Sequence, residues 1–497
     1  MNTKLKWLAA VAIMAAGGFY AYGLLTAARV PADLRDAVAD NSALGQLKGD
    51  GQGREYGIPA ASVQKDPGMD IPQVSPPSHE KGFFSSGNSA VPAPQPLKEW
   101  TVMVYMNGKN SLEMFTLYNL NKMELVGSDG SLNILTETGR MNGQPGDVTA
   151  DGNWTGSRRY YVTRDGDEKK VNSQVVRKFS SVDMGDWKQL VDFAKWGKKN
   201  YPARHYALIV WNHGSGWWTT KGDENKGISY DDETHNHIST PELGAAMREI
   251  GKVDILAYDA CLMQMAELLY EVRGYADYVV ASEETIPGEG FPYDVMLPAF
   301  KSSAGGGDIA MAMVRAYEEF YRREGGKATL SAVRMSALGD FMAAFNAWTD
   351  ALLAFDKKLP LRIKAYQARS YTYRDNKDIY DFADRAAKAD PRLAEKGRAM
   401  LDILEGKLIM NNTAWREFAA DPYSHGLAIY APNRYYNTKY DQLAWSRDTR
   451  WDEFVKGMLD VAPPKCPEFT GNETEQEMNA ILECADNLIA FNGLQLQ

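Results

Sequence analysis

The sequence predicts an α/β protein in which a mostly parallel sheet is flanked by helices and followed by a helix-rich C-terminal region. From about residue 99 to 301, apolar runs suited to buried strands alternate with amphipathic helical segments. This alternation favours a parallel sheet that is covered on both faces. After about residue 302 the pattern changes to long helical segments. Hydrophobic residues make up 44% of the 497 residues, which is enough for a large core.

The first 29 residues have the pattern of a signal peptide or a signal anchor. Lys4 and Lys6 precede an uncharged apolar run from Trp7 to Ala28, which is long enough to span a bilayer. Basic residues before such a run predict that the rest of the chain is exported. We therefore expect a periplasmic, secreted or anchored protein that meets a membrane only through this segment. Residues 30–98 are rich in Pro, Gly and Ser, and we interpret them as a linker or a pro-segment.

Residues 99–301 are expected to form one domain around the sheet. Apolar runs predict its buried strands, at 99–108, 131–140, 205–217, 253–263 and 275–290. Alternating polarity predicts an edge or antiparallel strand at 158–165, and amphipathic segments predict helices at 110–127 and 182–202. Asn110 or Ser111 is the expected cap of the first of these helices.

Residues 302–497 are expected to form the helix-rich region that packs on the sheet. Amphipathic segments predict its helices, at 308–325, 336–359, 391–408 and 449–462. One late strand is expected at 425–433.

Two of the expected strands end on residues that can do chemistry. The run "ALIVWNHG" ends with His213 and Gly214, and "ILAYDAC" ends with Asp259 and Cys261. Ligands of open α/β sheets bind where parallel strands end, so we expect His213 and Cys261 to be neighbours there. An imidazole can take the proton of a thiol and pass it to a leaving amine, which makes Cys261 the expected nucleophile and His213 its base. The backbone N–H groups of Gly214 and Cys261 are the expected donors to an oxyanion.

Each of these residues also has a purely structural interpretation. Taken singly, Cys261 is a small core residue, and His213 is a loop histidine. Asp259 is then the N-cap of a helix that begins at Cys261. The occurrence of both motifs at strand ends is what favours the chemical interpretation.

The two motifs "VWNHGSGW" and "YDACLMQMAEL" resemble the clostripain family of cysteine peptidases, which belongs to the caspase-like group. The stretches "WTVMVYMNGKNSLE", "ASEETIPGEGFPYD" and "HGLAIYAP" are also similar to this family. The resemblance implies a caspase-like fold, a Cys–His dyad and cleavage after arginine or lysine. It matches Asp259 to an acid of the pocket for that basic residue. Glu289 is the candidate for a second acid, at a position where the family more often has Asp.

The segment between the two motifs contains two bonds that a lysine-specific peptidase accepts. These are Lys221–Gly222 and Lys226–Gly227, in a polar stretch that is expected to be an exposed loop. The loop is either a site of activating self-cleavage, as the resemblance suggests, or an ordinary solvated loop. Near the C-terminus, Cys466 and Cys484 either form a disulfide in an oxidising compartment or remain apart.

Composition and motifs limit the partners and cofactors. The net charge of −10 and the pI of about 5.3 argue against nucleic acid as a partner. Protein or peptide substrates with Arg or Lys before the cleaved bond are the expected partners. No cofactor is expected to be required, although Asp231, Asp232 and Glu233 are oxygen ligands of the type that calcium prefers. No metal site is predicted there, because the segment lacks EF-hand spacing and a solvated loop is the favoured interpretation.

Two other functions use the same residues differently. Another thiol acyl-transfer enzyme, such as an amidase or a transpeptidase, has the same dyad but a different pocket. A non-enzymatic envelope protein keeps the fold for binding alone, but it has no need of both His213 and Cys261.

Overall fold

The computed structural model of the protein describes residues 97–144, 149, 151–217, 227–302, 304–324, 328–416, 419–461, 474 and 480. The expected signal segment and nearly all of the expected linker lie outside these residues. Within the described ranges, no helix combines the length and the apolar character that are needed to cross a membrane.

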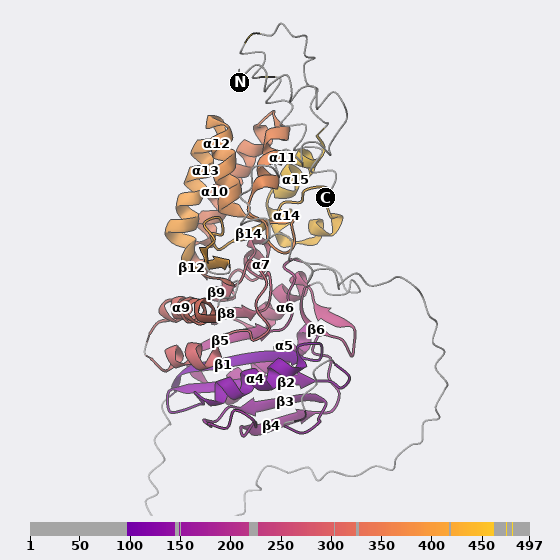
Figure 1. Ribbon diagram of the computed structural model, residues 1–497, viewed down its shortest axis with the longest axis vertical. Coiled ribbons are helices and arrows are strands. Elements are labelled where there is room, and N and C mark those ends of the chain that lie inside the picture. Colours follow the sequence, from indigo (N-terminus) through magenta and orange to yellow (C-terminus); the bar gives the residue numbers. More distant parts are fainter. Residues whose placement is uncertain are drawn as a thin grey trace, which may run out of the picture. The chain divides into compact units, whose positions relative to one another are not determined.

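A ten-stranded sheet forms the centre of the fold, with the strand order β13-β12-β10-β9-β8-β5-β1-β2-β3-β4 (Figure 1). Its five central strands are parallel: β9 (Ala276–Ala281), β8 (Val253–Asp259), β5 (Ala203–Trp211), β1 (Lys98–Gly108) and β2 (Leu132–Arg140). Antiparallel strands extend the sheet at both ends: β3 (Gly156–Tyr161), β4 (Gln174–Phe179), β10 (Ala328–Arg334), β12 (Ile409–Arg416) and β13 (Ala419–Ala420). The predicted parallel sheet is thus its central part.

Helices cover both faces of the sheet, because successive side chains of the central strands point to opposite faces. On β1, Met103 and Tyr105 share one core with α5 (Trp187–Asn200) and α6 (Thr240–Ile250). The alternate residues of β1 share the other core with two further helices, α4 (Glu113–Glu124) and α9 (Gly306–Glu324). Continuous apolar runs, rather than alternating ones, were the sequence pattern that predicted these doubly buried strands.

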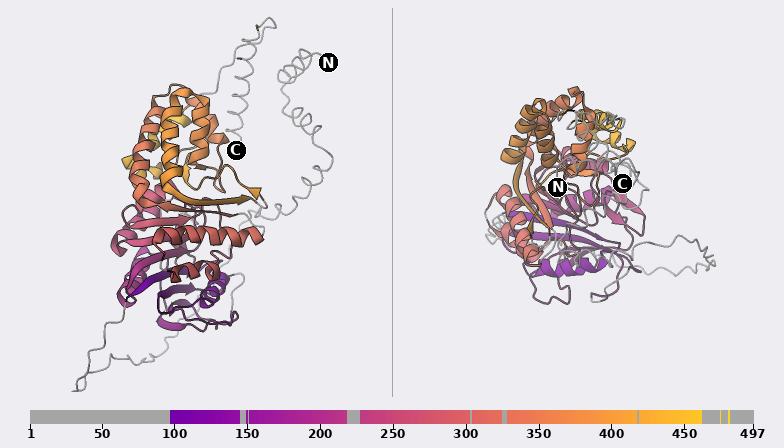
Figure 2. Two further views of the ribbon diagram at one scale, coloured as in Figure 1. Left: turned by 90° about the vertical axis from the view of Figure 1, so that its left-hand side faces the viewer. Right: turned by 45° about the horizontal axis from the view of Figure 1, so that its top comes forward.

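The remaining helices lie mainly in the second half of the chain. The longer ones are α10 (Leu338–Ala354), α11 (Lys358–Gln367), α12 (Ile379–Ala389), α13 (Pro391–Ile403) and α15 (Trp451–Leu459). The short ones are α7 (Ala266–Glu271), α8 (Tyr293–Met296), η2 (Leu297–Lys301), η3 (Met335–Ala337), η4 (Leu404–Leu408), η5 (Thr438–Gln442) and α14 (Ala444–Asp448). Figure 2 shows α10, α12 and α13 side by side beyond the end of the sheet that carries β12. Their apolar faces continue the core that contains α5 and α6.

The second half of the chain is less purely helical than the sequence predicts. Strands β10 and β12 come from this half and join the main sheet, so the sheet takes strands from both sides of the expected boundary near residue 301. The expected late strand at 425–433 shortens to β14 (Ala428–Tyr430), which pairs with β11 (Asn376–Asp378) in a separate two-stranded sheet. The expected strand at 158–165 is antiparallel, as predicted, but β4 covers its outer side.

A small hairpin follows β5. It consists of β6 (Ile228–Asp231) and β7 (Asn236–Ile238), and it precedes α6. The hairpin and the ends of β5 and β8 surround the region in which the two sequence motifs meet.

Candidate functional site

His213 and Cys261 follow two neighbouring parallel strands, as the sequence predicts. Trp211, the last residue of β5, pairs with Asp259, the last residue of β8. His213 and Cys261 each lie two residues beyond these strand ends. Both residues line one cavity of about 210 Å³, which we call the dyad cavity. Asp259 and Gly290 line it as well.

The Cys261 thiol is favoured in its protonated form in this site. Burial raises the pKa of the thiol, and the nearby charges of Asp259 and Glu284 raise it further. The Ile286 N–H donates a hydrogen bond to Sγ at 3.2 Å, which lowers the pKa but does not reverse the shift. Because the thiolate is the nucleophile, this cysteine needs a base to act.

The His213 imidazole has the properties of that base. Burial lowers the pKa of the ring, so the ring is neutral near pH 7 and able to accept a proton. Its Nε2 lies 3.0 Å from Ser111 Oγ. This contact engages Nε2, so Nδ1 is the ring nitrogen that remains to exchange a proton.

Ser111 is a site residue that the sequence analysis assigned to another role. The expected cap is wrong: Leu112 is the N-cap of α4, and no side chain caps this helix end. Asn110 Oδ1 accepts the Leu112 N–H at 2.9 Å, just before the helix. The hydroxyl of Ser111 contacts His213 instead, which is 102 positions away in the sequence. No local pattern around Ser111 carries a signal for a contact of this length.

The backbone turns sharply directly after Cys261. Leu262 is buried and has φ 65°, in the left-handed region that costs a non-glycine residue about 1–2 kcal/mol. Its N–H donates to the Glu284 carbonyl oxygen at 3.0 Å, which helps to hold the turn. The following helix, α7, begins only at Ala266. The interpretation of Asp259 as the cap of a helix starting at Cys261 is therefore wrong.

Asp259 places a buried carboxylate at the dyad cavity. Both of its oxygens accept the Phe291 N–H, at 3.1 and 3.0 Å, and Oδ2 also accepts the Tyr293 hydroxyl at 2.9 Å. Burial nevertheless raises the pKa of this carboxyl to about 7. Gly290 has φ 70°, and a Cβ there would come within 2.7 Å of Asp259 Oδ2, so the close approach of this turn requires glycine.

Glu289 lies in the same turn but in a different environment. Its side chain is exposed, and it is not among the residues that line the dyad cavity. The structure thus brings together His213, Cys261 and Asp259, whereas Glu289 stands outside this group.

Gly214 lies against the segment that carries Cys261. A Cβ at Gly214 would come within 2.4 Å of the Cys261 carbonyl oxygen, so a larger residue would push the two segments apart. The two backbone segments that are expected to supply oxyanion donors are therefore in direct contact.

The acidic stretch that begins with the last residue of β6 forms ion pairs with a lysine. Lys109 Nζ lies 3.0 Å from Asp231 Oδ2 and 2.5 Å from Glu233 Oε2, and both Lys109 and Asp231 are buried. The interpretation of this stretch as a solvated loop is wrong for Asp231, because hydrogen bonds and the ion pair hold it in the core. Over the described ranges, no group of three or more His, Cys, Asp or Glu side chains is arranged to hold a metal ion.

Several predicted residues lie outside the described part of the chain. These are Lys221 and Lys226 of the expected processing loop, and Cys466 and Cys484 of the expected disulfide. Their roles stay predictions.

Comparison with known proteins identifies the family. The model of the clostripain family matches residues 104–458. Clostripain of Hathewaya histolytica is 31% identical over 227 residues, which cover 42% of this chain and 43% of that protein. The chain thus aligns with less than half the length of that relative.

Two solved structures share the fold. One is a secreted C11 cysteine protease from Bacteroides thetaiotaomicron in complex with an irreversible peptide inhibitor, with a TM-score of 0.56. The other is an inactive zymogen C11 protease from Parabacteroides distasonis, with a TM-score of 0.54. Each is 20% identical to this chain; they cover 71% and 72% of it, respectively, and 99% of their own chains. The expected caspase-like α/β fold is confirmed, and the match of the family model over most of the sequence shows that the chain belongs to the clostripain family of cysteine peptidases.

Proposed function

We propose that the protein is a cysteine endopeptidase that cuts peptide bonds after arginine or lysine. The observation that carries this proposal is the dyad cavity, which joins a thiol, a neutral imidazole and a buried carboxylate. A buried carboxylate is unfavourable unless it is paired. The guanidinium or ammonium group of a substrate supplies the missing partner for Asp259.

The first half of the reaction acylates the enzyme. The basic side chain binds toward Asp259, and the scissile carbonyl carbon lies at Cys261 Sγ. His213 Nδ1 takes the thiol proton as Sγ attacks the carbonyl carbon, and the carbonyl oxygen becomes an oxyanion. The N–H groups of Gly214 and Cys261 are the donors to this oxyanion. When the C–N bond breaks, the imidazolium gives its proton to the leaving amine.

The second half releases the acid. Water loses a proton to His213 and adds to the thioester carbon, and the C–S bond then breaks. The sulfur recovers the proton from the imidazolium, which restores the starting thiol. No redox step or metal is part of this scheme, and the expectation that no cofactor is required stays a prediction.

A panel of fluorogenic peptide amides tests the proposal. The full chain should cleave amides that follow Arg or Lys and leave those that follow Ala or Glu nearly uncut. Equal turnover of neutral and basic amides would indicate an amidase with another pocket. Transfer of the acyl group to an added amine, in place of hydrolysis, would indicate a transpeptidase. Absence of turnover would indicate a binding protein.

The contact between Ser111 and His213 gives a testable positioning role. With Nδ1 as the base, Nε2–H donates to Ser111 Oγ and the hydroxyl stabilises the imidazolium. Ser111→Ala should therefore lower kcat about fivefold, since one such hydrogen bond contributes about 1 kcal/mol. The acid limb of the kcat–pH profile should also move to lower pH, because the imidazolium loses an acceptor. Ser111→Thr keeps the hydroxyl and should restore both values; an unchanged profile in Ser111→Ala would refute this role.

We also propose that the enzyme activates itself by cutting after Lys221 or Lys226. The two ends of this segment meet beside the dyad: Ser215 N–H donates to the Gly227 carbonyl oxygen at 3.0 Å, and Gly227 N–H donates to Ser215 Oγ at 2.6 Å. A cut after Lys226 would leave its new N-terminus on Gly227. The relative from P. distasonis, which is described as an inactive zymogen, prompts the same test.

Intact-mass analysis checks self-cleavage. Wild-type protein should yield fragments that end at Lys221 or Lys226, and Cys261→Ala protein should remain one chain. Lys221→Ala and Lys226→Ala show which bond is cut, and the double variant should stay uncut and inactive. A single uncut chain with full activity would contradict activation by cleavage.

Export and partners complete the proposal. We infer that the N-terminal segment directs the chain out of the cytoplasm, where protein or peptide substrates with Arg or Lys are its partners. The secreted relative from B. thetaiotaomicron supports this inference.

A further inference from the structure

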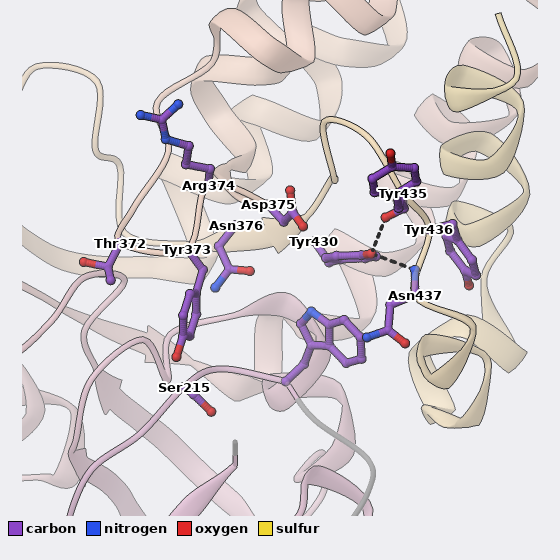
Figure 3. Close-up of a pocket in the computed structure, with 11 residues that line it drawn as sticks. Ser215, Thr372, Tyr373, Arg374, Asp375, Asn376, Tyr430, Tyr435, Tyr436 and Asn437 are labelled. Atoms are coloured by element: carbon purple, nitrogen blue, oxygen red, sulfur yellow. Dashed lines mark hydrogen bonds between the residues drawn. The ribbon is translucent and has the colours of Figure 1, made fainter. Parts of the chain in front are cut away.

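A second, larger cavity lies next to the dyad. Its volume is about 520 Å³, within the usual range for ligand pockets. Five of its lining side chains are aromatic: Trp217, Tyr373, Tyr430, Tyr435 and Tyr436. We call this cavity the aromatic pocket; Figure 3 shows its lining residues.

Residues on two sides of the aromatic pocket link it to His213 and Cys261. On one side, Ser215 and Trp217 follow His213 by two and four residues. On the other side, Thr372 donates from its N–H and its hydroxyl to Glu284 Oε1, at 3.1 and 2.5 Å.

Glu284 lies in the loop after β9. Ile286 of the same loop donates its N–H to Cys261 Sγ. Burial, together with the charge of Cys261, also raises the pKa of the Tyr373 hydroxyl, which indicates that this side chain lies near the thiol. A peptide held at Cys261 can therefore reach the aromatic pocket with a neighbouring residue.

The inner wall of the aromatic pocket is rigid. The rings of Trp217 and Tyr430 meet edge to face with centroids 4.8 Å apart, and both are buried. Tyr440 packs against both rings, at 4.9 and 4.7 Å. Trp451 Nε1 donates to the Tyr430 carbonyl oxygen at 2.8 Å, which fixes the strand that carries this wall. A fixed aromatic wall favours a planar apolar guest over one that needs the wall to adapt.

The outer part of the aromatic pocket leaves apolar surface open to solvent. Tyr373 is 43% exposed and Tyr435 is 74% exposed, and both line the pocket. Exposed aromatic side chains around a cavity mark a surface whose burial by a ligand is energetically favourable.

The polar groups of the aromatic pocket suit a peptide more than a cation. Asn376 is buried, and its Nδ2 has no hydrogen-bond partner among the described residues, so it can donate to a substrate carbonyl oxygen. The Asp375 carboxylate already accepts the Asn433 N–H at 3.2 Å. The positive charge of Lys377 also interacts favourably with this carboxylate. The Arg374 side chain points away from the other labelled residues in Figure 3. A cationic guest would therefore find little uncompensated negative charge.

We propose that the aromatic pocket is a second specificity site, which binds an aromatic side chain of the substrate within two residues of the cleaved bond. This inference rests on the proposed peptidase function. Asn376 Nδ2 donates to a backbone carbonyl oxygen of the same substrate segment. The enzyme then recognises two features of a peptide: a basic residue that binds in the dyad cavity and an aromatic residue that binds in the aromatic pocket.

Paired peptides and matched variants test the proposal. Each peptide carries Arg before the cleaved bond and Phe, Ala or Lys at one of the three other positions within two residues of that bond. At one of these positions, Phe should raise kcat/KM at least tenfold over Ala, as expected for burial of an aromatic side chain. The same peptides should show this ratio in their dissociation constants for the full-length Cys261→Ala protein, measured by calorimetry.

The variants assign the preference to the pocket. In Tyr373→Ala/Tyr435→Ala the Phe-to-Ala ratio should fall at least threefold, and both side chains are exposed enough for the fold to tolerate their loss. Tyr423→Ala is the matched control, because Tyr423 is 52% exposed and does not line the aromatic pocket; it should keep the wild-type ratio. Asn376→Leu should weaken binding of the Phe and Ala peptides equally.

The outcomes separate this inference from the proposed function. Failure of wild-type protein to cut any basic peptide would refute the peptidase function, whereas the binding ratio in Cys261→Ala protein would still decide the pocket. A Phe-to-Ala ratio near one at all three positions would overturn the pocket assignment. A preference for Lys over Phe, or a full preference in the double tyrosine variant, would overturn it as well.

Discussion

Cys261→Ala and His213→Ala should each lower kcat/KM for basic peptide amides by more than about a thousandfold, because each removes one half of the same proton-transfer pair. The Cys261 thiol is favoured in its protonated form by burial, so it has no activity without a base. The His213 ring is kept neutral by burial, so it can serve as that base near pH 7. The double variant should be no worse than either single one, since the two residues act as a unit.

Fluorogenic assays on the folded variants give the measurement, with thermal unfolding as the check on folding. His205→Gln is the matched control, because His205 lies on the same strand, β5, but near its opposite end. It should keep wild-type activity. Substantial turnover by the alanine variant at Cys261 would show that another group is the nucleophile.

Asp259→Asn should lower kcat/KM for Arg and Lys substrates at least tenfold. Removing one partner of a buried charge pair costs a few kcal/mol of transition-state stabilisation. The reason is that a buried cationic side chain would lose its charged partner while the shape of the site is kept. Neutral peptides, which gain nothing from this carboxylate, should lose little. Glu289→Gln is the matched comparison and should have a smaller effect, because the Glu289 side chain is exposed to solvent.

The pH dependence gives Asp259 a second signature. Because the pKa of its carboxyl is raised to about 7 in the empty site, the acid form predominates below that pH. A cation binds to the ionised form, so kcat/KM for basic substrates should rise as the pH rises through about 7. In Asp259→Asn this limb should move to lower pH, since His213, whose pKa is lowered by burial, then remains as the controlling group. An identical limb in wild type and variant would exclude Asp259 as its source.

The sequence best predicted those strands and helices whose local residue pattern reflects which of their faces are buried. The central strands β1, β5, β8 and β9 were predicted, because burial on both faces requires an uninterrupted apolar run. Helix α5 was predicted from its amphipathic spacing. Strands β10 and β12 were not, because they lie between helices and the pairing that defines them joins distant parts of the chain.

The sequence alone also predicted which residues meet at the candidate site. It placed His213 and Cys261 at the ends of two parallel strands, and parallel strands must end on the same edge of the sheet. It gave Gly214 and Cys261 as the expected oxyanion donors, and the structure brings these two backbone segments into contact. These statements depend on residue type and strand order, which the linear pattern carries.

Only the tertiary structure decided how the remaining groups divide their roles. Ser111 is a candidate helix cap in the sequence, yet Leu112 is the N-cap of α4, and the Ser111 hydroxyl contacts His213 instead. Asp259 and Glu289 are both acids near the nucleophile, but the fold buries the first in the dyad cavity and leaves the second in solvent. The aromatic pocket joins residues on both sides of position 301. Burial, pKa and pocket shape arise from contacts between segments far apart in the chain, and for that reason no local pattern could predict them.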